Sequence, residues 1–271
     1  MKWIKSLVWV VFGCAVIVFG VATVREFLNR DTAKPVIKSE QEEITIPCGY
    51  TYEEITEGLT ASDEEDGDLT DQILLGRMSR FIETGVCDLT YVVFDSSNQS
   101  ASLTRRIRFS DYESPEFRSS LPLVYIVKEG DYEQTMARLS VYDRLDGEMK
   151  DAIQVTASSV LYSTEGTYSM TLEATNNFGD TSTLEVPVHI VAADNLKAEI
   201  KLTQYIYYVN QGETFDPLQL IDEGQAGSLT KDQIYVISNP VNTGQPGVYE
   251  VQYGVDVEGQ TSMTWATVVV R

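Results

Sequence analysis

Three aspartates in one short acidic segment are the side chains most able to do chemistry. Asp63, Asp66 and Asp68 lie within six residues, with Gly67 between the last two. Carboxylate oxygens are the ligands that Ca²⁺ prefers. The spacing is not that of an EF-hand, because the twelfth position from Asp63 is Leu74, where that loop needs a bidentate glutamate. Asp and Gly also form ordinary turns. The segment therefore indicates either a Ca²⁺ site at a domain edge or a plain turn, and we expect no other cofactor.

The sequence offers little for catalysis. His189 is the single histidine, and a serine or cysteine nucleophile needs a base that accepts its proton. His189 neighbours the inward-facing Val188 in an alternating segment, so we predict that it points to solvent. No cysteine and histidine group has zinc spacing. We predict a protein that is not an enzyme.

An aromatic run in the C-terminal third could bind a ligand. Tyr205, Tyr207 and Tyr208 surround Ile206, and exposed tyrosines offer flat faces to sugars or to protein partners. Alternation along a strand would bury or half-bury two of the three. The run is therefore a candidate ligand-binding site, with packing into a core as the alternative.

Two cysteines follow the first 30 residues, while Cys14 lies within an N-terminal apolar segment. Cys48 precedes a glycine, and Cys87 starts a regular strand pattern. In an up-and-down strand order both lie at the same end of one domain, and export would permit oxidation. We predict a disulfide between Cys48 and Cys87, with two free buried thiols as the alternative.

The elements that must position these residues repeat at a spacing of about 81 residues. Gly85, Gly166 and Gly247 are separated by this interval, and each precedes a stretch in which apolar and polar residues alternate. A polar turn and a second such stretch follow, as in a β-hairpin. The sequence predicts an all-β chain of three tandem immunoglobulin-like sandwiches over residues 31–111, 112–193 and 194–271.

The first 30 residues contain an uncharged apolar run from Ser6 to Val24. As a helix it would be about 28 Å long, close to the thickness of a bilayer core. Lys2 and Lys5 favour a cytoplasmic N-terminus. We therefore expect residues 1–30 to be a transmembrane anchor in the cell membrane, with the rest extracellular. A cleaved signal peptide and a secreted protein are the alternative.

The chain is strongly acidic, with a formal net charge of -21. Such a surface repels phosphate backbones and anionic headgroups and favours solubility. Nucleic acid is therefore excluded as a partner.

Several motifs in fixed order resemble a known family. They are Asp-x-x-Asp-Gly-Asp-Leu-Thr at 63–70, Gly-x-Cys at 85–87 or Gly-x-Tyr at 166–168, and a strand that closes on Asp-Ser-Ser-Asn at 95–98. In this order they resemble the bacterial Ig-like domains, of the group-three or HYR-like kind, that occur in tandem on surface proteins of Gram-positive bacteria and in some pesticidal crystal proteins. The third repeat departs from the pattern, because it lacks the second Asp and the Asp-Gly step.

The resemblance implies a fold and a location rather than an activity. We expect an extracellular stalk or adhesive, ligand-binding module whose partner is a surface protein or a polysaccharide. An accessory subunit that positions a membrane partner or an enzyme is one alternative. A secreted carbohydrate-binding protein is the other.

Overall fold

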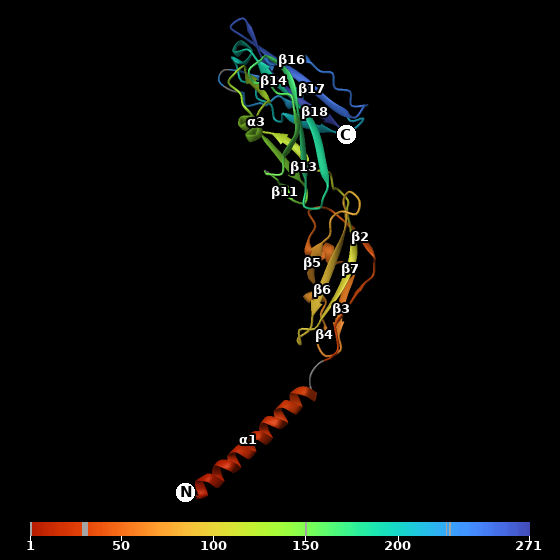
Figure 1. Cartoon of the computed structure of the whole chain (residues 1–271). Helices are drawn as coiled ribbons and strands as arrows, with labels where there is room; N and C mark the ends of the chain where they lie inside the picture. Colours follow the sequence, from red (N-terminus) through yellow and green to blue (C-terminus); the bar gives the residue numbers. More distant parts are fainter. Residues whose placement is uncertain (1, 29–31, 150, 226, 228) are drawn as a thin grey trace. The chain divides into compact units, whose positions relative to one another are not determined.

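The computed structural model describes residues 2–28, 32–149, 151–225, 227 and 229–271 (Figure 1). Contacts divide the chain into two compact units. The first holds most of the chain up to Phe109, and the second holds Ser110–Arg271 together with Pro47–Gly49 and Glu83–Gly85. The second and third repeats therefore fold within one unit. The expected boundary between residues 30 and 31 lies outside the described residues.

The N-terminal helix α1 covers Lys2–Leu28. Within the part of the chain that the structure describes, no helix has both the length and the apolar character needed to cross a bilayer. The predicted transmembrane anchor over residues 1–30, and with it the cell-membrane location, is therefore wrong.

The first repeat contains two sheets. The short helix α2 (Tyr52–Thr56) lies in the chain between a strand of the larger sheet and a strand of the smaller one. The three-stranded sheet has the order β1-β3-β4, over Val36–Ser39, Leu59–Asp63 and Gly67–Asp68. The four-stranded sheet has the order β2-β7-β6-β5, over Glu43–Ile46, Ser100–Phe109, Val86–Phe94 and Leu74–Met78. The 3₁₀ turn η1 covers Thr70–Gln72. β2 is parallel to β7, and the other pairs are antiparallel.

The second repeat has the same topology, with the helix α3 (Tyr132–Arg138) in the place of α2. Its smaller sheet has the order β11-β10-β8, over Gly147–Glu148, Leu139–Asp143 and Glu116–Ser119. Its larger sheet has the order β12-β13-β14-β9, over Gln154–Ser158, Gly166–Thr175, Thr181–Val191 and Val124–Ile126.

The third repeat has one sheet of named strands among the described residues. Its order is β15-β18-β17-β16, over Ile206–Val209, Gln260–Val270, Gly247–Val257 and Tyr235–Ser238. An isolated bridge joins Leu202 to Ile221. The 3₁₀ turns η2, η3 and η4 cover Ala193–Leu196, Pro217–Leu220 and Lys231–Gln233. The repeat therefore keeps the long hairpin and the parallel strand of the other two.

The predicted alternation is present in all three hairpins. In β13, Met170, Leu172 and Ala174 are buried, and in β17 Val251 and Tyr253 are buried. The prediction of a mostly β chain is confirmed. The core of the second repeat also includes Ile206 from the third repeat, so the apolar packing continues across the junction of these two repeats.

A buried arginine interrupts the apolar face of the first repeat. Arg105 on β7 is 1 % exposed and takes the position that Val186 has in β14. Its guanidinium donates hydrogen bonds to the carbonyl oxygens of Ile55 and Glu57, each at 2.6 Å. It also lies 5.1 Å from the ring centroid of Tyr91. Arg105 therefore satisfies the C-terminal carbonyls of α2 from inside the core.

We expect Arg105→Ala to destabilise the first unit by about 3 kcal/mol or more, because the Glu57 carbonyl loses its donor, the Ile55 carbonyl loses one of its two donors, and a cavity remains. The free energy of unfolding, from denaturant titration of the full chain, measures the loss. The matched control is Arg106→Ala, which removes an exposed ion pair with Asp88 worth about 1 kcal/mol at most. Equal losses in the two variants would contradict the assignment.

Candidate functional site

The acidic turn of the first repeat is held by hydrogen bonds from backbone amides. Asp63 Oδ1 accepts hydrogen bonds from the amides of Glu65 (2.9 Å) and Asp66 (3.2 Å). Asp66 Oδ2 accepts one from the amide of Ser96 (2.7 Å). Asp68 Oδ1 accepts one from the amide of Thr70 (2.9 Å). Hydrogen bonding by the Thr70 side chain and then by its amide lowers the pKa of Asp68. Each carboxylate therefore accepts hydrogen bonds from a different stretch of backbone.

The predicted convergence of Asp63, Asp66 and Asp68 on Ca²⁺ is not found. Within the described ranges, no group of three or more His, Cys, Asp or Glu side chains is arranged to hold a metal ion. The physical reason is that backbone amides engage each carboxylate separately: amides two or three residues away bind Asp63 and Asp68, and the amide of Ser96 binds Asp66.

The second repeat uses the same arrangement. Asp143 Oδ1 accepts hydrogen bonds from the amides of Leu145 (2.8 Å) and Asp146 (3.0 Å), and Asp146 Oδ2 accepts one from the amide of Asn177 (2.7 Å). In both repeats, therefore, the second aspartate ties the acidic turn to the turn of the long hairpin. We call this arrangement the aspartate clasp, formed by Asp63 and Asp66 in the first repeat and by Asp143 and Asp146 in the second.

The three candidate tyrosines do not form a common exposed face. Tyr205 is buried, and its hydroxyl accepts a hydrogen bond from the amide of Leu202. Tyr207 is half-buried, with its ring centroid 5.7 Å from that of Phe215. Tyr208 is also half-buried, and burial raises its pKa to about 12. Packing therefore accounts for most of this aromatic run.

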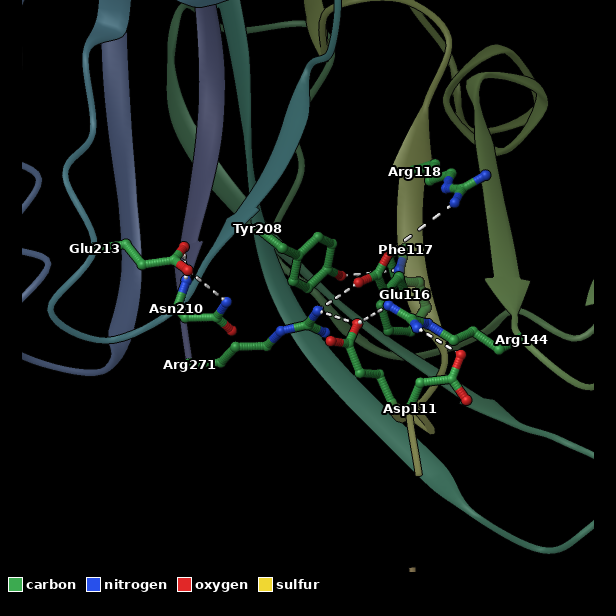
Figure 2. A network of polar contacts seen from close by, with 10 residues as sticks. Asp111, Glu116, Phe117, Arg118, Arg144, Tyr208, Asn210, Glu213 and Arg271 are labelled. Carbon is green, nitrogen blue, oxygen red and sulfur yellow. Dashed lines mark hydrogen bonds and ion pairs between the residues drawn. The ribbon is translucent and has the colours of Figure 1, made fainter. Parts of the chain in front are cut away.

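Tyr208 connects the third repeat to the second. Its hydroxyl accepts a hydrogen bond from the amide of Phe117 (2.9 Å), and the guanidinium of Arg271 lies 4.9 Å from its ring centroid. Arg271 Nη2 donates to carboxylate oxygens of Glu113 and Glu116, each at 2.6 Å. Figure 2 shows Tyr208 and Arg271 reaching toward Glu116 and Phe117. These contacts hold β15 and the end of β18 close to β8.

A polar hollow of about 360 Å³ lies beside this network, between β8 and β15. It is lined by Glu116, Arg118, Ser119, Thr203, Gln204, Ile206 and Tyr208. Carboxylate, guanidinium, hydroxyl and amide groups thus surround one tyrosine. Of the tyrosines that the sequence indicated, Tyr208 alone lines the hollow.

Arg118 is the exposed cation of the hollow, and its position is constrained. The guanidinium lies 4.1 Å from the ring centroid of Tyr142, and Nη1 is 3.3 Å from Glu148 Oε1. Sequence reasoning missed Arg118 and Gln204. They are 86 residues apart in the printed sequence, and only the packing of the second repeat against the third brings them together.

The prediction that His189 points to solvent is wrong. His189 is 6 % exposed, and its ring stacks on Trp265 with the centroids 4.1 Å apart. Nε2 lies 2.7 Å from Glu250 Oε1, and Nδ1 lies 3.1 Å from Thr167 Oγ1. Buried and exposed side chains alternate along most of β14 as predicted. The third repeat, however, covers His189 on the face that alternation assigns to solvent.

Cys48 and Cys87 are free thiols in this structure, as is Cys14. Cys48 is half-buried, and its amide donates a hydrogen bond to Asp111 Oδ1 (2.7 Å). Burial and then Asp111 raise the pKa of the Cys48 thiol to about 12, and burial raises that of Cys87 to about 11. The disulfide between Cys48 and Cys87 stays a prediction.

Comparison with curated proteins finds one distant relative. No family model matches the sequence. The pesticidal crystal protein Cry22Aa of Bacillus thuringiensis is 28% identical over 245 residues, which are 82% of this chain and 31% of that protein. The chain thus spans about a third of the length of this relative, and the resemblance to bacterial Ig-like domains stays a prediction.

Comparison with solved structures finds likenesses with low TM-scores. One is the CBM51-2 and INT domains of Clostridium perfringens ZmpB in complex with GlcNAc, with a TM-score of 0.24 and 16% identity over 56% of this chain and 26% of that chain. Another is the extracellular domain of protocadherin GammaB4, with a TM-score of 0.21 and 13% identity over 88% of this chain and 50% of that chain. At these TM-scores the likenesses carry no argument about the site.

We expect Tyr208→Phe to destabilise the second unit by about 1–2 kcal/mol, because the amide of the buried Phe117 loses its acceptor. Denaturant unfolding of the full chain measures this change. Tyr235→Phe is the matched control, since the Tyr235 hydroxyl contacts Asp256 at an exposed position, and a loss below about 0.5 kcal/mol is expected. If the two variants lost the same stability, Tyr208 would not connect the repeats as described.

We expect Cys48 and Cys87 to react slowly with iodoacetamide in the folded, reduced protein. At pH 8 thiols with pKa values of about 12 and 11 are ~0.1% thiolate or less, against about 10% for an ordinary thiol of pKa near 9. Mass spectrometry of timed samples should show labelling at least about 100-fold slower before unfolding than after it. Rates that are equal before and after unfolding would contradict the burial. Absence of labelling in unreduced, unfolded protein would instead show the Cys48–Cys87 disulfide.

Proposed function

We propose that the chain is a non-catalytic binding module of three tandem Ig-like domains and that the hollow between β8 and β15 is its ligand site. The observation that carries the proposal is the lining of the hollow. It combines hydroxyl, amide and charged groups with the half-buried Tyr208. Such a set supplies many hydrogen-bond donors and acceptors around one aromatic surface, as recognition of a polyhydroxylated ligand requires.

The ligand class that fits this lining is a carbohydrate. Glu116, Ser119 and Thr203 offer acceptors, while Arg118 and Gln204 offer donors. Arg118 is already held against Tyr142 and Glu148, so little side-chain freedom is lost on binding. The net charge of -21 disfavours polyanions, and a neutral glycan is the expected ligand.

A second function, that of a spacer in a surface protein, is favoured by a different observation. The first and second repeats share both sheet topology and the aspartate clasp. Recurrence of structural contacts from one repeat to the next is typical of a repeat that extends a chain. In this case a protein partner would bind elsewhere on the chain, and the hollow would bind no glycan.

We expect the full chain to bind members of a neutral-glycan array, with binding reduced at least about tenfold by Arg118→Ala and by Gln204→Ala, because each removes a hydrogen-bond donor from the hollow. Binding constants from titration calorimetry with the best glycan measure the effect. Arg106→Ala is the control, because it removes an equally exposed arginine from the first unit. Unchanged binding in both hollow variants would refute the site. Absence of any glycan binding would leave the spacer function.

A further inference from the structure

Two buried carboxylate oxygens in the first repeat have no hydrogen-bond partner among the described residues. They are Asp63 Oδ2 and Asp95 Oδ2, and the two side chains are 9% and 6% exposed. A buried carboxylate oxygen without a donor or a cation is costly, by several kcal/mol for an ionised group. Native proteins therefore usually place a donor or a cation beside such an atom.

Asp63 and Asp95 lie at the same end of the first repeat. Asp63 is the last residue of β3, and Asp95 directly follows β6. The aspartate clasp joins the two segments, because Asp66 Oδ2 accepts a hydrogen bond from the amide of Ser96, the neighbour of Asp95. The other oxygens of the pair are engaged with backbone, since Asp95 Oδ1 accepts from the amide of Gln99 (2.7 Å). Of the four carboxylate oxygens of this pair, the two Oδ2 atoms are the ones without a hydrogen-bond partner.

In the second repeat, an amide group lies beside the corresponding carboxylate oxygen. Its corresponding residues are Asp143 and Asn176. Asn176 Nδ2 donates to Asp143 Oδ2 (3.1 Å) and to the hydroxyl of Tyr112 (2.8 Å), and that hydroxyl donates to Asp180 Oδ2 (2.9 Å). The amide of Asn176, together with the Tyr112 hydroxyl at 3.2 Å, therefore satisfies Asp143 Oδ2, the oxygen that corresponds to Asp63 Oδ2. A carboxylate at position 95 cannot donate in this way.

We infer that Asp63 and Asp95 bind a hard divalent cation, which replaces the amide that Asn176 provides in the second repeat. Two carboxylates supply two negative charges and oxygen ligands, the combination that Ca²⁺ and Mg²⁺ prefer. Water and backbone carbonyls complete the coordination shell of such cations when a protein gives few side chains. The site differs from the set that the sequence indicated, because Asp66 and Asp68 are engaged with backbone amides and Asp95 takes their place.

The test uses Ca²⁺ as the probe and the full chain stripped of metal by chelator. Titration calorimetry should show one bound Ca²⁺ per chain, and the ion should raise the melting temperature of the first unit. Asp95→Asn introduces the amide of the second repeat in the same shape, and its Oδ1 can still accept from Gln99. We expect this variant to remain folded without metal and to bind Ca²⁺ at least about tenfold more weakly. Asp63→Asn is a second variant with the same expected loss, in case the first does not fold.

The matched control is Glu64→Gln, which removes one negative charge from the same turn at an exposed position. It should bind Ca²⁺ as the unmodified chain does. No binding to the unmodified chain, full binding to Asp95→Asn, or equal loss in Glu64→Gln would overturn the proposal, the last because it would show diffuse attraction to an acidic surface. The outcome is independent of glycan binding, since the hollow lies in the second unit.

Discussion

A long antiparallel hairpin organises each repeat of this chain. The pairs β6–β7, β13–β14 and β17–β18 run in continuous register, and a parallel strand (β2, β9 or β15) pairs with the second strand of each. This register sends one row of side chains into the core and the other outward. A one-residue slip would exchange the two rows. The turn of each hairpin and the parallel strand beside it therefore have fixed positions. Asp95 lies at one such turn, and the hollow lies beside the parallel strand β15.

The aspartate clasp shows how one turn can have either a structural or a ligand role. In both repeats, aspartates accept hydrogen bonds from nearby backbone amides, which removes those oxygens from any metal site. One difference lies at the start of the hairpin turn, where the second repeat has Asn176 and the first has Asp95. The amide of Asn176 donates a hydrogen bond to the neighbouring carboxylate. The carboxylate of Asp95 cannot donate, and two buried oxygens are left without a partner, which a bound cation would stabilise.

The junction of the second and third repeats decides the fate of residues that a single repeat would expose. The third repeat covers His189 with Trp265 and Glu250, and it places Tyr208 over β8. The same apposition creates the hollow, because β8 and β15 meet through Tyr208 and Arg271 and leave polar side chains around a gap. The burial of His189 and the hollow at this junction thus have one cause.

The sequence alone determined the repeat, the β class, the hairpins and the alternating core, because these depend on local periodicity and on glycines at fixed spacing. It also indicated Tyr208 and Asp63. Pairings between distant segments decided the rest. Apposition of repeats buried His189 and assembled the hollow. The amides of Thr70 and Ser96 engaged Asp68 and Asp66 apart from Asp63, and the packing of two turns joined Asp95 to the acidic segment. Such contacts depend on sheet packing rather than on periodicity, and a one-dimensional pattern holds no signal for them.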